Sequence, residues 1–367
     1  MTERDGFLTQ LEHGLRATAL ALTLMTQSAL AADAATGQPE AGAGGVSIAD
    51  GEFLYEVYCA TCHGDRGEGY TADNAVALNN PDFLAAASDA FLRGSIANGR
   101  PDTPMAAYSS RYGGPLSAPE IDALVAYIRG WQRVPSVDMP TVPIVGDGAA
   151  ALDDFSAHCA GCHGSEGQGV TAVSLNNPEF LAAATDRQIR HAIAKGRRGT
   201  PMVGFGTTLS ATAIDNLVAL IRSWQVAVSA PTAAASLAPI EGVVLNPGGP
   251  TPEFLLRDGR YVSAAQLDTA MRGGARLVVL DARPASDWRY KRIPGAVSAP
   301  HYDALSVIDV LPDDGTWIVS YCACPHKLSD QLTDTLRDAG FANTAVLDEG
   351  VLWWEKNGYP IQRAAGR

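Results

Sequence analysis

The chain has little cysteine and little positive charge. Only six of its 367 residues are cysteine, and 27 lysines and arginines face 40 aspartates and glutamates, for a formal net charge of −13. That balance argues against nucleic acid or an anionic lipid surface as a partner. A long hydrophobic run is also lacking, because the apolar stretch 17–31 is too short for a comfortable membrane span. The hydrophobic content of 46% is that of a folded protein, and the length suggests two or three domains.

Four of the six cysteines occur in two copies of one short motif. The copies are Cys59-Ala-Thr-Cys62-His63-Gly64 and Cys159-Ala-Gly-Cys162-His163-Gly164. A Cys-x-x-Cys pair followed at once by His is the attachment signature of a c-type haem. Its two thiols form thioethers to one porphyrin, and the imidazole binds the iron. The sequence therefore predicts two covalently bound haem c groups, held by Cys59, Cys62, Cys159 and Cys162, with His63 and His163 as iron ligands.

Two other interpretations of these cysteines fit less well. In a four-cysteine zinc site built from both pairs, 96 residues would separate Cys62 from Cys159 (159 − 63), far more than the usual spacing of zinc knuckles. A thioredoxin-like redox pair does not require a His after its second Cys.

A tandem duplication surrounds the two motifs. Asn79-Asn80-Pro81 recurs as Asn176-Asn177-Pro178, and Thr103-Pro104-Met105 recurs as Thr200-Pro201-Met202, both at an offset of 97. Only these two of the six methionines are at matched positions. A thioether suits low-spin haem iron, so we expect Met105 and Met202 to be the sixth ligands rather than core residues. His158 and His191 have no counterparts in the first copy and are expected to be surface or packing residues.

Helical periodicity in each copy and a change of texture after residue 250 define the domains. The patterns predict helices at 48–58, 89–98, 121–131 and 214–224. A linker rich in Ala and Pro follows the second copy. After it, apolar β-branched runs are found at 277–281, 316–321 and 344–347, and helical stretches at 263–271 and 328–339. This alternation indicates an α/β domain with a parallel sheet. We expect domains at 46–135, 148–226 and 251–367.

The first two domains resemble tandem class I cytochromes c of the c4-like, diheme kind. The matching residues are the two haem motifs, the two Pro-Met pairs and the closing Leu-Val-Ala-x-Ile-Arg helices. The resemblance implies two all-α domains, electron transfer, and axial positions that are both filled. It also implies redox partner proteins, such as a respiratory oxidase or another cytochrome.

The remaining two cysteines lie in one loop, Cys322-Ala-Cys324-Pro-His326-Lys327, between the last residue of a predicted strand and a helix. A thiol at Cys322 would face backbone N–H groups and the positive end of a helix, with Lys327 and His326 nearby, and these features favour the thiolate. A thiolate can accept a sulfane sulfur and hold it as a persulfide.

This layout resembles the rhodanese-like sulfurtransferases over residues 251–367. The Leu277–Arg283 segment followed by Ile293-Pro-Gly-Ala, and the closing Gly358-Tyr-Pro, carry the resemblance. It implies that Cys322 is the nucleophile and that a small inorganic sulfur compound is the substrate. Lys327 stands where the commoner loop has Arg, which weakens oxyanion recognition. Cys324 is a resolving thiol, a second redox thiol or an inert loop residue.

Residues 1–31 are typical of a signal peptide. Arg16 precedes the apolar run, and Ala29-Leu30-Ala31 provides a small-x-small cleavage site. The resemblance to cytochromes c implies haem attachment outside the cytoplasm, so we expect a periplasmic protein that is bound to the membrane only if the leader is uncleaved.

Two functions follow from these features. In the first, the two haem domains transfer electrons coupled to persulfide chemistry at Cys322. In the second, the protein is a plain electron carrier whose rhodanese-like domain is non-catalytic or an independent thiosulfate sulfurtransferase.

Overall fold

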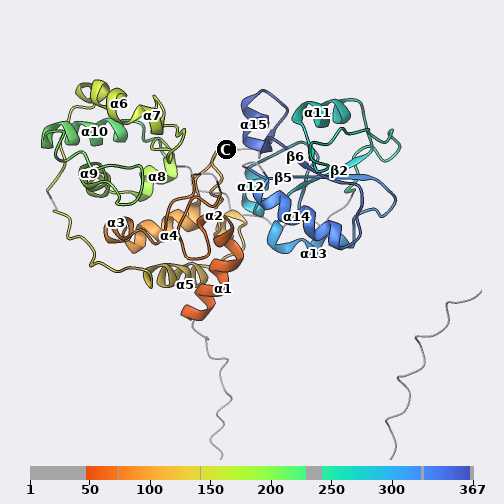
Figure 1. Cartoon of the computed structure of the whole chain (residues 1–367), viewed down its shortest axis with the longest axis horizontal. Coiled ribbons are helices and arrows are strands. Elements are labelled where there is room, and N and C mark those ends of the chain that lie inside the picture. The colour runs from red at the N-terminus through yellow and green to blue at the C-terminus, as the bar shows by residue number, and fades with distance from the viewer. Residues whose placement is uncertain (1–46, 73, 141, 229–241, 324–325, 364–367) are drawn as a thin grey trace, which may run out of the picture. The chain divides into compact units, whose positions relative to one another are not determined.

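The computed structural model describes residues 47–72, 74–140, 142–228, 242–323 and 326–363 (Figure 1). The expected signal peptide and Cys324 lie outside the described residues. No helix that these residues form is long and apolar enough to cross a membrane.

The first domain is all helical. Its helices are α1 (Ile48–Tyr58), α2 (Ala60–His63), α3 (Pro81–Ala86), α4 (Asp89–Asn98), the 3-10 turn η1 (Ser110–Tyr112) and α5 (Ala118–Arg129). A capping box between Ser47 and Asp50 begins α1. Helix α1 packs against α5 at Gly51, where an added Cβ would lie 2.4 Å from the carbonyl oxygen of Ala123. Glycine is therefore what allows α1 and α5 to approach so closely.

The second domain repeats the order of the α-helices, with a 3-10 turn before its first helix and, among the described residues, none between its last two. Its elements are η2 (Ala149–Ala151), α6 (Leu152–His158), α7 (Ala160–His163), α8 (Pro178–Ala183), α9 (Asp186–Lys195) and α10 (Ala211–Ser223). The helix before its haem motif is thus shorter than α1 and begins with a 3-10 turn.

One continuous core connects the two helical domains. It contains buried residues from both, and α4 packs against α8, where the rings of Phe91 and Phe180 meet edge to face at 6.3 Å. The tandem copies are therefore packed on each other.

The third domain contains a five-stranded parallel sheet in the order β1-β6-β5-β2-β4. Its strands are β1 (Tyr261–Val262), β2 (Leu277–Asp281), β4 (Val297–Ser298), β5 (Trp317–Tyr321) and β6 (Thr344–Leu347), while β3 (Lys291–Arg292) and β7 (Gln362–Arg363) form a separate antiparallel pair. The helices are α11 (Ala264–Arg272), α12 (Ala285–Tyr290), α13 (Leu305–Ile308), α14 (Lys327–Asp338) and α15 (Gly350–Lys356), with the 3-10 turn η3 (His301–Asp303).

Helices cover both faces of this sheet (Figure 1). Leu277 and Val279 of β2 belong to one buried cluster with residues of α11 and α15, whereas Val278 and Leu280 belong to a second cluster with residues of α13 and α14. Successive strand residues point to opposite faces, so a strand covered on both sides is apolar throughout. The predicted multidomain fold, two helical domains followed by an α/β domain with a parallel sheet, is confirmed.

Candidate functional site

The first haem motif is a single helical turn. Cys59 precedes α2, and its carbonyl oxygen accepts hydrogen bonds from the backbone N–H groups of Cys62 at 3.1 Å and His63 at 2.9 Å. The Nδ1 of His63 lies 2.9 Å from the carbonyl oxygen of Val76. A histidine that donates through Nδ1 presents Nε2 as the metal ligand, and the hydrogen bond fixes the orientation of its ring.

The second motif has the same geometry. The Nδ1 of His163 lies 2.8 Å from the carbonyl oxygen of Val173, and Cys159 accepts the same two backbone bonds. Burial lowers the pKa of both His63 and His163, which favours the neutral imidazole that iron binds. Burial also raises the pKa of Cys59 to about 12, so this thiol is unsuited to redox exchange of the thioredoxin kind.

The two Pro-Met loops are built alike. Thr103 Oγ1 donates to the carbonyl of Arg100 at 2.7 Å and accepts from the N–H of Met105 at 3.2 Å. Thr200 repeats both contacts with Arg197 and Met202, at 2.9 and 3.2 Å. The duplication therefore extends to the hydrogen bonds that shape each loop.

Arg100 supports the fit of a haem to the first domain. Its Nε is buried and has no hydrogen-bond partner among the described residues, and burial lowers the pKa of the guanidinium to about 10. Buried cations normally pair with anions. A c-type haem brings propionate carboxylates. The motif supplies the thiols and the imidazole, and Met105 supplies a thioether, so the donor set fits this group.

The third domain holds Cys322 directly after β5, at the carboxyl end of a central strand of the parallel sheet. The side chain is 1% exposed. The Ser329 hydroxyl, in the first turn of α14, lies 3.4 Å from Sγ and 3.0 Å from the carbonyl oxygen of His326. The backbone N–H of Val351 donates to the Cys322 carbonyl at 2.9 Å. When the hydroxyl donates to sulfur rather than to the carbonyl, it favours the thiolate over the thiol.

His326 and Lys327, the other predicted residues of this loop, have different surroundings. His326 has a φ of 72°, and its Nε2 lies 2.7 Å from the carbonyl oxygen of Asp348 and 2.9 Å from its carboxylate. Lys327 is exposed, and no described residue forms a hydrogen bond or an ion pair with its side chain.

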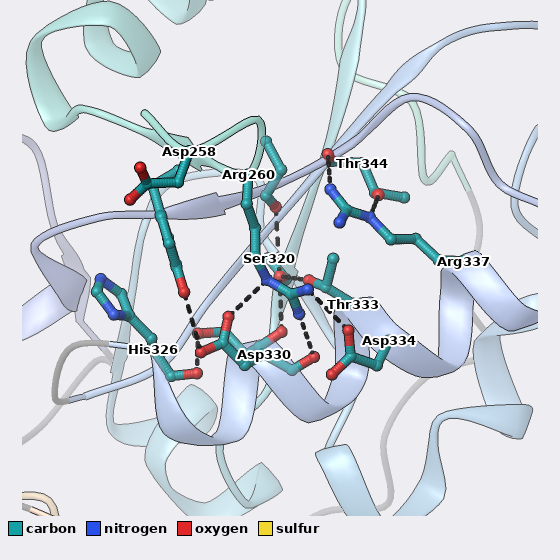
Figure 2. A network of polar contacts seen from close by, with 12 residues as sticks. Asp258, Arg260, Ser320, His326, Asp330, Thr333, Asp334, Arg337 and Thr344 are labelled. Atoms are coloured by element: carbon teal, nitrogen blue, oxygen red, sulfur yellow. Dashed lines mark hydrogen bonds and ion pairs between the residues drawn. The ribbon is translucent and has the colours of Figure 1, made fainter. Parts of the chain in front are cut away.

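Helix α14, which follows the loop, is fixed to the sheet by polar contacts (Figure 2). Arg260 donates to the carboxylates of Asp330 and Asp334, each at 2.7 Å, and the hydroxyls of Ser320 and Thr333 lie 2.5 Å apart. The helix that carries Ser329 is thereby held in one position relative to β5.

A second network, which the sequence pattern did not reveal, lies beneath the loop. The guanidinium of Arg283 donates to both carboxylate oxygens of Asp281, and the Tyr321 hydroxyl donates to the same carboxylate at 2.7 Å. The Tyr321 hydroxyl also accepts from the N–H of Ile293 at 3.2 Å. These contacts join the Asp-x-Arg and Ile-Pro-Gly-Ala segments to the residue before Cys322. Only their separate motifs were visible in the sequence.

His158 and His191 are placed as expected from the repeat. His158 is exposed, with its ring 5.5 Å from that of Phe205. Burial lowers the pKa of His191, which lies half-buried on α9. His158 is therefore a surface residue, and His191 is partly packed within the second domain.

Two family models match the chain. The model of the cbb3-type cytochrome c oxidase subunit III matches residues 46–128 and 147–221, and the rhodanese-like domain model matches residues 263–357. These matches confirm cytochrome c domains joined to a rhodanese-like domain, and cytochrome c domains imply covalently bound haem c.

Individual relatives agree with this division. The chain is 28% identical over 181 residues to the cbb3-type cytochrome c oxidase subunit FixP of Azorhizobium caulinodans, which covers 48% of this chain and 59% of the relative. It is 29% identical over 123 residues to arsenate reductase 2.1 of Oryza sativa subsp. japonica, covering 30% of this chain and 75% of the relative. The chain thus spans about three fifths of the FixP protein.

Among solved structures, a thiosulfate sulfurtransferase from Pseudomonas aeruginosa is similar to the third domain. It is 26% identical with a TM-score of 0.27, and the match covers 29% of this chain and 21% of that one.

Proposed function

Because the chain consists of c-type cytochrome domains followed by a rhodanese-like domain, we propose that it transfers electrons through two haem c groups and couples this transfer to persulfide chemistry at Cys322. The observation that carries the persulfide chemistry is the position of Cys322: it lies at the carboxyl end of a central strand, 3.4 Å from the Ser329 hydroxyl. Open α/β sheets bind their ligands at this end of the strands.

The cytochrome domains supply the electron-transfer sites. Cys59 and Cys62 hold one haem, with His63 and Met105 as its iron ligands. Cys159 and Cys162 hold the other, with His163 and Met202. With a His and a Met as its iron ligands, haem held by these residues would accept and pass on single electrons and would leave no position for a substrate.

The sulfur step has a simple balance. The Cys322 thiolate and hydrosulfide join through a new S–S bond, which yields a persulfide, one proton and two electrons. Two one-electron sites match that release. With thiosulfate, the thiolate attacks the sulfane sulfur, the S–S bond of the donor breaks and sulfite leaves, with no electron released.

One observation and one chemical argument bear on the choice of donor. Lys327 is exposed and stands where the commoner loop has Arg, so an oxyanion such as thiosulfate would meet a point charge rather than the two-pronged guanidinium. Hydrosulfide is small and needs no such recognition. We therefore place hydrosulfide before thiosulfate as the donor.

One specific observation favours the alternative, a plain electron carrier. Cys322 is only 1% exposed, so its thiol is shielded from solvent in this conformation. The cytochrome pair would then carry electrons to a respiratory partner, and the rhodanese-like domain would be non-catalytic or act as an independent thiosulfate sulfurtransferase. The name of the FixP relatives supports a partner of the respiratory kind.

The proposed location is the periplasm, with an oxidase or another cytochrome as the redox partner. The motif at residues 17–31 supports export, since its apolar run ends in a small-x-small site.

Haem content tests the first half of the proposal. The double variant Cys59→Ala/Cys62→Ala and its matched counterpart Cys159→Ala/Cys162→Ala should each reduce the ratio of covalent haem to protein from two to one. A ratio of one covalent haem per protein in the unaltered chain would refute the assignment of two haems.

Mass spectrometry of Cys322 tests the second half. After anaerobic incubation of the oxidised protein with hydrosulfide, the peptide that contains Cys322 should gain one sulfur, and Cys322→Ser should abolish the gain. Thiosulfate with cyanide, and arsenate with a thiol reductant, are the comparison substrates. Thiocyanate formation without haem reduction would favour an independent sulfurtransferase.

A further inference from the structure

The rhodanese-like domain contacts both ends of the loop that carries Met105. From helix α12, the Ser286 hydroxyl donates to the carbonyl oxygen of Ala107 at 2.6 Å. From β3, the Lys291 ammonium donates to the carboxylate of Asp102 at 2.5 Å. Met105 lies between Asp102 and Ala107 in the chain. A residue between two anchored points has less freedom to move than one in a free loop.

The ion pair at Asp102 is built into the fold. Lys291 is 2% exposed, and its second partner is the carboxylate of Glu355. The Tyr290 hydroxyl donates to the other carboxylate oxygen of Asp102 at 3.1 Å. A buried ammonium depends on its anionic partners, so Asp102 is an integral member of this cluster.

The backbone at Asp102 is strained, with a φ of 63°. The matched residue of the second loop, at the repeat offset of 97, is Gly199 with a φ of 75°. Glycine adopts this conformation without cost, whereas other residues pay for it, aspartate less than most. The side chain of Asp102 reaches the rhodanese-like domain. At this position the first loop therefore has a residue for which a positive φ is less favourable than it is for glycine.

The second loop has no such attachment. Among the residues that the structure describes, none of the rhodanese-like domain is hydrogen-bonded to residues 199–204, and Gly204 stands where the first loop has Ala107. The two loops share their internal hydrogen bonds and differ in this external support.

The motif side of the first haem site is contacted as well. The rings of Tyr58 and Tyr302 are 4.8 Å apart, and the Gln331 side chain on α14 donates to the Thr61 hydroxyl at 3.3 Å. The matched residues of the second motif are His158 and Gly161, and neither has this contact among the described residues. The rhodanese-like domain thus lies against one haem site on both sides.

We propose that Ser286, Lys291 and Asp102 are positioning residues for Met105, through which the rhodanese-like domain strengthens the iron–Met bond of the first haem and raises its potential relative to an unsupported loop. The inference depends on the proposed role of Met105 as an iron ligand. Met/His ligation raises the haem potential. If the iron–Met bond opens less often, other ligands replace the Met more slowly.

The test uses imidazole, which binds ferric haem only after Met leaves the iron. Asp102→Gly gives the first loop the residue of the second and relieves the strained φ. In the full-length variant, we expect imidazole to bind the first haem roughly three- to tenfold faster, as loss of a partly exposed charged hydrogen bond implies. One reduction potential should fall. The binding rate and potential of the second haem should not change, which makes the second site an internal control.

Ser286→Ala removes the other anchor without touching the charged cluster, and it should change the same rate in the same direction. Met105→Ala identifies the phase that belongs to the first haem. If Met105→Ala alters that phase but Asp102→Gly and Ser286→Ala leave rate and potential unchanged, the positioning role is refuted while ligation stands. If Met105→Ala changes neither spectrum nor binding, the ligation itself is refuted, and the positioning role with it.

Discussion

Arg197 places its guanidinium over the ring of Phe83, 5.1 Å from the ring centroid, and so crosses from the second cytochrome domain to the first. Arg100 of the first domain repeats the contact on Phe180 of the second, at 5.2 Å. The side-chain amides of Asn80 and Asn177 also form reciprocal hydrogen bonds, because each donates at 2.9 Å to a backbone carbonyl of the other domain. The two copies therefore meet through a pseudo-symmetric, isologous surface.

Asp82 and Arg198 make that surface sensitive to pH. The carboxylate accepts hydrogen bonds from the guanidinium at 2.7 to 3.0 Å, and these bonds hold the pKa of Asp82 below its ordinary value of 3.8. A depressed carboxyl pKa contributes stability above the unfolded pKa, and this contribution is lost as pH falls through the folded pKa.

We expect Asp82→Asn to lower the free energy of unfolding by about 0.5–1 kcal/mol at pH 7, because Arg198 is largely exposed, and by less at pH 3. Thermal denaturation of both proteins at the two pH values measures the difference. An equal loss at pH 7 and pH 3 would show that the charge of Asp82 is not responsible.

Gly51 provides a test of the packing around the first haem motif. A Cβ at this position would lie 2.4 Å from the Ala123 carbonyl oxygen, so Gly51→Ala should push α1 away from α5 and destabilise the first domain by about 1–3 kcal/mol. Gly94→Ala in α4 is the control, because the nearest atom to its added Cβ is the Cβ of Ala183 at 3.6 Å, an ordinary contact. Chemical denaturation followed by the haem absorption band measures both, and equal effects would contradict the packing argument.

The sequence predicted the elements whose burial is uniform or periodic. The β2 strand, Leu277–Asp281, was found with its exact limits because every residue in it is buried. Helix α1 and β6 also matched, whereas the two-residue strands β1 and β4 and the antiparallel β3–β7 pair were missed. Strands this short carry no periodicity, and their existence depends on neighbours distant in sequence.

The candidate site residues were predictable where a motif repeats. Repeated motifs predicted haem-binding roles for Cys59, His63 and Met105 with their counterparts, and the structure repeats the hydrogen bonds of the two Met loops. Ser329 and Ser286 could not be found in this way. Their roles arise from contacts that the tertiary fold creates, and an isolated serine in a sequence has no feature that marks it.

Ser329 offers a direct probe of the Cys322 thiol. Its hydroxyl is 3.4 Å from Sγ, so removing it in Ser329→Ala should destabilise the thiolate relative to the thiol. The pH profile of Cys322 alkylation by iodoacetamide should then move to higher pH. Ser306→Ala, on the exposed surface, should leave the profile in place. An unchanged profile in Ser329→Ala would remove Ser329 from the site.

The central claim is that oxidation of sulfur at Cys322 supplies electrons to the haems. Its most direct test is anaerobic stopped-flow mixing of the fully oxidised protein with hydrosulfide, followed at the haem α-band. We expect both haems to be reduced as Cys322 becomes a persulfide, and Cys322→Ala to slow this reduction at least tenfold. Equal rates in the two proteins would contradict the coupling and leave a plain electron carrier.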